Sequence, residues 1–147
     1  WITAAEIEDV ADIEAIQGAA DFLASLPPDC WGIVTSAPRA LAQARLAAAG
    51  LPSANLLVAA EDVEHGKPAP DPFLLGARKL GVAPADCLVF EDTRTGLQSA
   101  AAAGMDSIVV TVTHAHPMET DVFATLDYVA LRAVRTAEGR LQVVTAS

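Results

Sequence analysis

Short apolar runs alternate with alanine-rich stretches of helical spacing along most of this chain, and this alternation constrains its fold more than any other feature. The runs are Trp31–Thr35, Leu56–Ala59, Cys87–Phe90 and Ser107–Val112. Continuously apolar strands separated by helices are typical of a parallel sheet that is covered on both faces. The chain is therefore predicted to be an α/β protein with helices on both faces of a parallel sheet.

The segments between these runs carry helix start and stop signals. Helices are predicted over residues 38–50, 71–80 and 94–103, each followed or ended by a glycine, and the first two have proline in their first turn. Asp71 is predicted to cap the second of them, with Pro72 as its first helical residue. Ahead of the first run, a short acidic helix over 4–10 and a helix over 18–26 are predicted. The tail contains two weaker strand candidates, residues 128–130 and 141–144.

The charge balance and the cysteines limit the partners and the location of the protein. Nine Lys and Arg face nineteen Asp and Glu, and the net charge is −10, which argues against binding nucleic acid or an anionic membrane surface. No run approaches the ~18 apolar residues of a membrane helix, so a soluble protein is expected. Cys30 and Cys87 are predicted to be small, buried, reduced thiols, and the sequence has no export signal, so a cytoplasmic location is expected.

Polar side chains with related chemistry follow the carboxyl ends of the predicted strands. In an open parallel sheet these ends meet at one edge, where ligands bind. Thr35 and Ser36 follow the first strand and precede a helix start, where an anion is favoured. Lys67 lies in a loop stiffened by proline and can neutralise a phosphoryl oxygen. Glu91 and Asp92 follow the third strand, and adjacent carboxylates at a buried strand end suit a hard cation such as Mg²⁺.

Each of these residues also has a plain structural interpretation. The two hydroxyls of Thr35 and Ser36 could cap the next helix, and Lys67 could be a solvated surface residue. Asp92 could be a helix N-cap beside a solvated Glu91. The sequence alone leaves these alternatives open.

Three motifs nevertheless occur in an order that resembles a known family. They are Ile33–Ser36, Gly66–Pro72 and Val89–Gly96. They resemble the second, third and fourth motifs of the haloacid-dehalogenase-like superfamily of phosphohydrolases, and most closely its sugar-phosphate and glycerol-phosphate phosphatase branch. The resemblance implies a Rossmann-like core and a small phosphorylated metabolite as substrate. It implies that Thr35 and Ser36 bind the phosphoryl group, that Lys67 stabilises it, with Thr35 and Lys67 as catalytic residues, and that Glu91 and Asp92 hold Mg²⁺.

The family's first motif is an Asp-x-Asp pair that contains the nucleophile, and no such pair occurs in these 147 residues. The cap that normally follows this motif is absent too, apart from a possible remnant. We therefore expect the sequence to be the later part of a longer enzyme, with residues 1–17 a remnant of the cap helix and its return linker and residues 18–147 the core. A β-phosphoglucomutase-like phosphotransferase and a non-catalytic binding module are the alternative functions.

Overall fold

A computed structural model of the chain describes residues 10, 12–113 and 123–145. Its α-helices are α2 (Ala19–Ser25), α3 (Arg39–Ala48), α4 (Asp71–Leu80) and α5 (Arg94–Ala102), and its 3₁₀ helices are η1 (Ala60–Asp62) and η2 (Pro84–Asp86). Its strands are β1 (Ile33–Val34), β2 (Leu57–Val58), β3 (Leu88–Glu91), β4 (Asp106–Val110), β5 (Phe123–Thr125), β6 (Leu131–Arg135) and β7 (Leu141–Thr145). The predicted acidic helix over 4–10 lies outside the described residues, apart from Val10.

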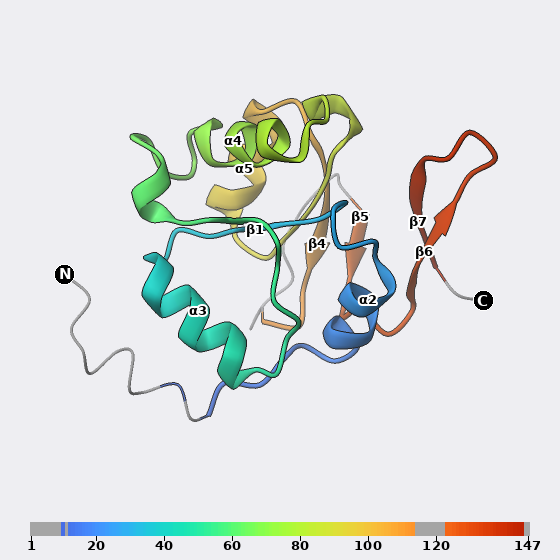
Figure 1. Cartoon of the computed structure of the whole chain (residues 1–147), viewed down its shortest axis with the longest axis horizontal. Coiled ribbons are helices and arrows are strands. Elements are labelled where there is room, and N and C mark those ends of the chain that lie inside the picture. Colours follow the sequence, from blue (N-terminus) through green and yellow to red (C-terminus); the bar gives the residue numbers. More distant parts are fainter. Residues whose placement is uncertain (1–9, 11, 114–122, 146–147) are drawn as a thin grey trace.

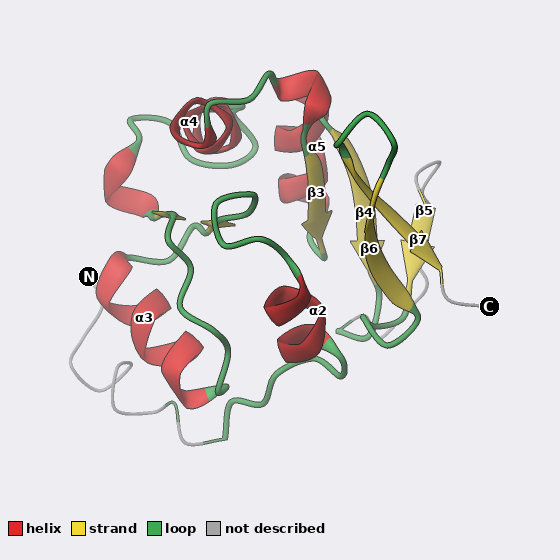
Figure 2. Cartoon of the chain, turned by 45° about the vertical axis from the view of Figure 1, so that its right-hand side comes forward, coloured by secondary structure: helices red, strands yellow, loops and turns green. Residues whose placement is uncertain are grey.

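The strands form two parallel groups and one antiparallel hairpin. β1 pairs with β2, and β3, β4 and β5 pair in that order, all in parallel. Helices α4 and α5 lie on one side of these strands and α2 and α3 on the other (Figure 1). The predicted α/β class, with a Rossmann-like arrangement of parallel strands and helices on both faces, is confirmed. The hairpin of β6 and β7 is antiparallel (Figure 2), and β6 contacts α2.

The tail differs from the prediction. Residues 128–130, predicted as a strand, form a bend and turn between β5 and β6. The Asp127 carboxylate accepts a hydrogen bond from the Val129 N–H (2.9 Å), which closes an Asx turn there. A neighbouring side chain thus overrides the strand propensity of Tyr128 and Val129. The second candidate, residues 141–144, is confirmed as β7.

Small side chains contribute much of the core between β3 and helices α4 and α5. Phe73 and Ala77 of α4 pack with Val89 of β3, and Ala100, Ala103 and Met105, in and just after α5, complete this core.

Helix α4 has the predicted bounds, but Pro70 is its N-cap and Asp71 its first residue, so the predicted cap was one position too late. Gly81 ends the helix with a φ of 72°, a conformation that glycine adopts without strain.

An aromatic cluster joins the start of the described chain to its tail. The rings of Phe22, Phe90 and Tyr128 have centroids 5.5 to 5.6 Å apart. The Tyr128 N–H donates to the Gln17 carbonyl (3.1 Å). Gly18, with a φ of 79°, lies so close that a Cβ there would be 2.6 Å from the Val129 nitrogen. This contact seats α2 against the loop that leads into β6.

The cysteines meet their prediction only in part. Cys30 is exposed, so the prediction that it is buried was wrong; Cys87 is half-buried, and neither forms a disulfide. Cys30 lies in the turn that links α2 to β1, where no core is available to cover it. In the described part of the chain, no helix has the length and apolarity needed to cross a bilayer.

Candidate active site

Lys67 links the carboxyl ends of β1 and β3. Its ammonium donates a hydrogen bond to the Val34 carbonyl at the end of β1 (3.2 Å) and forms an ion pair with Glu91 at the end of β3. Thr35 follows Val34 directly, and its N–H donates to the Val58 carbonyl of β2 (2.9 Å). The structure thus brings the neighbourhood of Thr35, Lys67 and Glu91 together, as the convergence of parallel strand ends predicts.

Lys67 is buried rather than solvated. Its side chain is 10% exposed, and its ammonium lies 4.8 Å from the centre of the Phe73 ring, in a cation–π contact. The peptide bond between Lys67 and Pro68 is cis. The surface-lysine interpretation is therefore wrong, because the proline loop directs this side chain inward to a carboxylate.

Glu91 accepts hydrogen bonds from three residues of the site. Its side chain is 8% exposed, and one carboxylate oxygen faces Lys67. The other accepts hydrogen bonds from the N–H groups of Asp92 (3.1 Å) and Thr93 (3.1 Å) and from the Thr93 hydroxyl (2.9 Å). Gly96 makes room for this carboxylate, since a Cβ at that position would overlap it. Glu91 is therefore saturated by donors of the chain itself, and a buried charge needs such partners.

The protonation of Glu91 follows from these partners. Burial would by itself raise the pKa of Glu91, but the hydrogen bond and charge of Lys67, together with the two donors of Thr93, lower the pKa below its ordinary value. The carboxylate is thus charged at neutral pH and holds the Lys67 ammonium in place.

Asp92 lies next to Glu91 and is half-buried. Its carboxylate accepts a hydrogen bond from the Thr113 hydroxyl, which follows β4 (3.1 Å). The N-cap of α5 is Thr93, whose hydroxyl oxygen accepts from the Gly96 N–H (3.0 Å). The alternative that Asp92 is the helix cap is therefore wrong, and its carboxylate lies at the rim of the site instead.

The hydroxyls after β1 do not cap the helix that follows them. The Thr35 hydroxyl oxygen accepts from the Ala37 N–H (3.1 Å), which closes a short turn, and Ser36 is exposed. The N-cap of α3 is Pro38, which has no side-chain hydrogen bond to the helix. The capping interpretation of Thr35 and Ser36 is therefore wrong. Both residues lie in a turn between a strand end and a helix start, where an anion is favoured.

The donor chemistry of the site fits Mg²⁺. Carboxylate oxygens are ligands that Mg²⁺ prefers, and it commonly uses one or two of them with water and phosphate. The described residues contain no group of three or more His, Cys, Asp and Glu side chains that could enclose a metal. Of the two carboxylates that the sequence predicted as ligands, Glu91 binds Lys67 and Thr93, and Asp92 lies at the rim of the site beside Thr113.

Sequence reasoning missed Thr93, Gly96 and Tyr128. Thr93 stands just before a predicted helix and Gly96 three residues later, so a cap was readable there, but its link to Glu91 was not. Tyr128 comes from the distant tail. Burial, followed by the charges of Asp92 and Glu91, raises the pKa of Tyr128 to about 12, so its phenol stays neutral beside these carboxylates.

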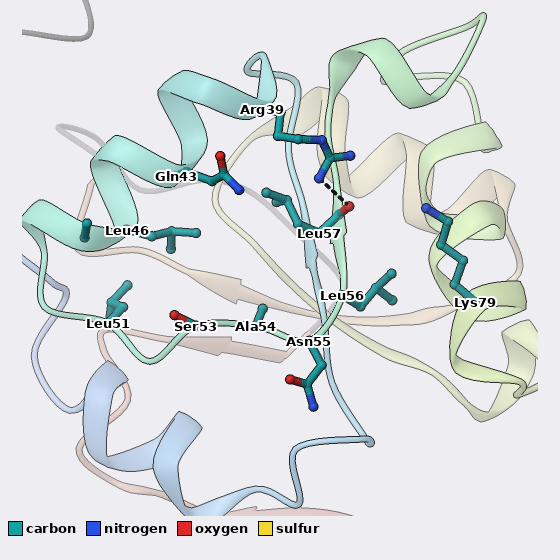
Figure 3. Close-up of a pocket in the computed structure, with 11 residues that line it drawn as sticks. Arg39, Gln43, Leu46, Leu51, Ser53, Ala54, Asn55, Leu56, Leu57 and Lys79 are labelled. Atoms are coloured by element: carbon teal, nitrogen blue, oxygen red, sulfur yellow. Dashed lines mark hydrogen bonds between the residues drawn. The ribbon is translucent and has the colours of Figure 1, made fainter.

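A cavity of about 620 Å³ lies apart from these residues, at the outer side of β2 (Figure 3). It is bounded by α3, by the segment 51–57 and by Lys79 of α4. Arg39 lines it and donates to the Leu57 carbonyl (3.3 Å). None of the predicted site residues lines this cavity.

Comparison with known proteins places these features in context. A family model for haloacid dehalogenase-like hydrolases matches residues 3–104. The chain is 44% identical to hexitol phosphatase A of Escherichia coli K12 over 110 residues, which cover 71% of this chain and 50% of that protein. It is 51% identical to fructose-1-phosphate phosphatase YqaB of the same organism over 77 residues, which cover 52% and 41% of the two chains.

A solved structure shares the fold. The crystal structure of a HAD hydrolase of family IA, variant 3, from Entamoeba histolytica matches with a TM-score of 0.66 and 28% identity. The match covers 80% of this chain and 56% of that one. The matched part of the chain therefore spans about half the length of each of these three proteins.

Proposed function

Because the chain belongs to the haloacid dehalogenase-like hydrolases, we propose that it forms part of a Mg²⁺-dependent phosphatase of small phosphorylated metabolites, of the sugar-phosphate or glycerol-phosphate type. The observation that carries this proposal is the buried pair of Lys67 and Glu91, which joins two parallel strand ends beside Thr35 and Asp92. A lysine ammonium held at this point by a buried carboxylate can stabilise the charge of a phosphoryl group.

Thr35, Ser36 and Lys67 bind and stabilise the phosphoryl group in this proposal. The turn at Thr35 and Ser36 presents hydroxyls and N–H groups to its oxygens, close to the start of α3. Lys67 offers its remaining N–H to an equatorial oxygen and stabilises the charge that develops there during transfer. Glu91 acts on Lys67, because its carboxylate fixes the ammonium in place.

The nucleophile in this proposal is an Asp that lies outside these 147 residues, since the sequence contains no Asp-x-Asp pair. Its carboxylate oxygen attacks phosphorus in line, and the ester oxygen takes a proton from the second Asp of that pair, the general acid, and leaves as the alcohol. Water then cleaves the resulting aspartyl-phosphate and releases inorganic phosphate. Asp92, at the rim of the site, would hold Mg²⁺, which when bound offsets the negative charge of nucleophile and phosphate, whereas Glu91 stays paired with Lys67.

The arrangement of the chain is part of the proposal. Residues 1–17 are assigned to the cap and its return linker, and residues 18–147 to the catalytic core, which α2 opens. The cytoplasm is the proposed compartment, because Cys30 and Cys87 are unpaired thiols.

The proposal is tested by comparing the complete gene product with the 147-residue chain. The complete protein should hydrolyse sugar phosphates and an aryl phosphate in the presence of Mg²⁺, whereas the 147 residues alone should not. Removal of a covalent catalytic residue commonly costs several orders of magnitude in rate. Comparable turnover by the 147-residue chain would mean that the nucleophile is misassigned, and release of an isomerised sugar phosphate without inorganic phosphate would identify a phosphotransferase.

The metal assignment is tested in the complete protein by calorimetric titration with Mg²⁺. Asp92→Asn should weaken Mg²⁺ binding at least tenfold, because it removes the carboxylate at the rim of the site. Asp106→Asn is the matched control, since Asp106 is exposed at the amino end of β4, away from the strand ends that form the site. Equal affinities of the two variants would refute the assignment.

A further inference from the structure

Arg39, the first residue of α3, makes three separate contacts with the strand and turn that precede Lys67. Its guanidinium donates to the Leu57 carbonyl of β2 (3.3 Å) and pairs with the Asp62 carboxylate (2.5 Å). Its backbone N–H donates to both carboxylate oxygens of Glu61 (3.1 and 3.2 Å). We call this set of residues, Arg39, Leu57, Glu61 and Asp62, the Arg39 latch.

The latch is extended by two backbone contacts. The Asp62 carboxylate also accepts from the Ala59 N–H (2.8 Å), which fixes its position at the end of β2. The Ala60 N–H donates to the Ala37 carbonyl (3.1 Å). The hydrogen bond from Ala59, with the charge of Arg39, lowers the pKa of Asp62, so this carboxylate is ionised at neutral pH.

Ala37 connects the latch to the candidate phosphate site. Its carbonyl accepts from Ala60, and its N–H donates to the Thr35 hydroxyl oxygen (3.1 Å). Ala60 of η1 therefore holds the turn of Thr35 and Ser36 in position through Ala37. Arg39 itself faces the outer side of β2 and the cavity there (Figure 3), so it does not reach the phosphoryl position.

We propose that Arg39 is a positioning residue whose guanidinium fixes the phosphate-binding turn at Thr35 and Ser36 by clamping it to η1 through Asp62. This inference rests on the proposed function, because it assigns a role in binding the phosphoryl group. The guanidinium suits the role because its planar fork supplies N–H groups in two directions, one for Leu57 and one for Asp62. A lysine at this position could keep the charge but not both contacts.

The test separates binding from turnover in the complete protein. Arg39→Ala should raise the KM for the phosphate ester and the inhibition constant of inorganic phosphate about tenfold, while kcat stays within about twofold, because the turn holds the phosphate in the ground state and the transition state alike. Arg39→Lys should lie between wild type and Arg39→Ala. Arg45→Ala is the matched control, since it removes the same charge from the exposed end of the same helix.

A double-mutant cycle shows whether Arg39 acts through Asp62. Asp62→Asn should weaken phosphate binding to a similar extent, and the double variant should be no weaker than either single variant. An unchanged KM with kcat reduced in proportion to the unfolded fraction would overturn the proposal, because this is what a purely structural role predicts. Additive effects of the two substitutions would overturn it as well.

Amide hydrogen exchange makes the result independent of the reaction. The N–H groups of Ala37 and Ala60 should exchange at least tenfold faster in Arg39→Ala than in Arg45→Ala, whether or not the protein is a phosphatase. Unchanged exchange at these two amides would refute the latch itself. If exchange accelerates but the wild-type protein neither binds inorganic phosphate nor hydrolyses phosphate esters, the proposed function fails and the assigned role of Arg39 fails with it.

Discussion

At the scale of single residues, the molecule is organised around one buried ion pair. Lys67 comes from a loop and Glu91 from the end of β3, their side chains are 10% and 8% exposed, and they form an ion pair. Burying two charges costs several kcal/mol per ion unless each finds its partner and further hydrogen bonds. Because Glu91 has three other donors and Lys67 one other acceptor, removing either partner should harm the fold as well as the function.

Lys67→Met should lower the free energy of unfolding by about 3 kcal/mol at neutral pH, because it leaves the Glu91 carboxylate buried without a cation. Urea denaturation followed by circular dichroism measures this change. Lys79→Met is the control, since Lys79 is exposed on α4 and its loss should cost less than about 0.5 kcal/mol. Equal losses in the two variants would contradict the burial argument.

The stability conferred by Glu91 should depend on pH in one direction. Its pKa is lowered in the folded state from an ordinary value of 4.5, so its contribution is complete above the unfolded pKa and is lost as the pH falls through the folded pKa. The difference in unfolding free energy between wild type and Glu91→Gln should therefore be largest at pH 6 to 7 and shrink toward pH 3. A difference that grows on acidification would show that Glu91 is protonated in the folded protein.

The chemistry of these residues was predictable, but their pairing was not. Lys67, Glu91 and Asp92 stand out because of their places after apolar runs, and parallel strand ends must converge. The orientation of Glu91 toward Lys67 depends on the packing of Glu91 against Gly96 of α5 and of Lys67 against Phe73 of α4. No local pattern in the sequence encodes that packing.

At the scale of elements, the start of α5 is built around the Glu91 carboxylate. Thr93 caps the helix and donates to Glu91, and Gly96 leaves the space that this carboxylate fills. The positive end of the helix dipole favours a negative charge there. Helix α5 thus accommodates the buried Glu91 carboxylate at its start and also covers the sheet.

Gly96→Ala should destabilise the protein by about 2 kcal/mol, although alanine normally favours a helix, because the new methyl group must displace the Glu91 carboxylate. Thermal unfolding measures the effect. Gly66→Ala adds the same methyl group where nothing lies within 4 Å, so it should change stability by less than about 0.5 kcal/mol. A stabilising Gly96→Ala would mean that the carboxylate can move without loss.

Element boundaries were predictable where the signals are local. Helix α4 begins and ends at the predicted residues because Pro72 and Gly81 act on the backbone beside them. The tail was mispredicted because the Asx turn that the Asp127 carboxylate closes with the Val129 N–H overrides the strand propensity of these residues. β1 and β2 are shorter than the apolar runs that predicted them, since only two residue pairs of these runs form ladder contacts.

At the scale of the whole molecule, strands β6 and β7 of the described hairpin contain one buried side chain. Leu131, the first residue of β6, is 1% exposed, and β6 contacts α2. Arg140, just before β7, pairs with Asp86 of η2. Since an exposed ion pair contributes little, Leu131 is the main attachment of the hairpin to the body.

Leu131→Ala should therefore cost about 3 kcal/mol of unfolding free energy, through lost burial and the cavity left behind. Val134→Ala, in the same strand but 40% exposed, should cost less than about 1 kcal/mol. Urea denaturation of both variants measures the difference. Similar losses would place the anchor elsewhere in the hairpin.

The close contact between Gly18 and Val129 has a consequence for the order of folding. The hydrogen bond between Gln17 and Tyr128 closes a loop of about 110 residues, so its formation carries an entropic cost that contacts between chain neighbours do not. We expect this join to form after the sheet and its helices have brought the two segments together. Once formed, this contact holds the start of α2 against the tail. Mechanical force or a protease that acts on either segment must therefore first separate it from the folded protein.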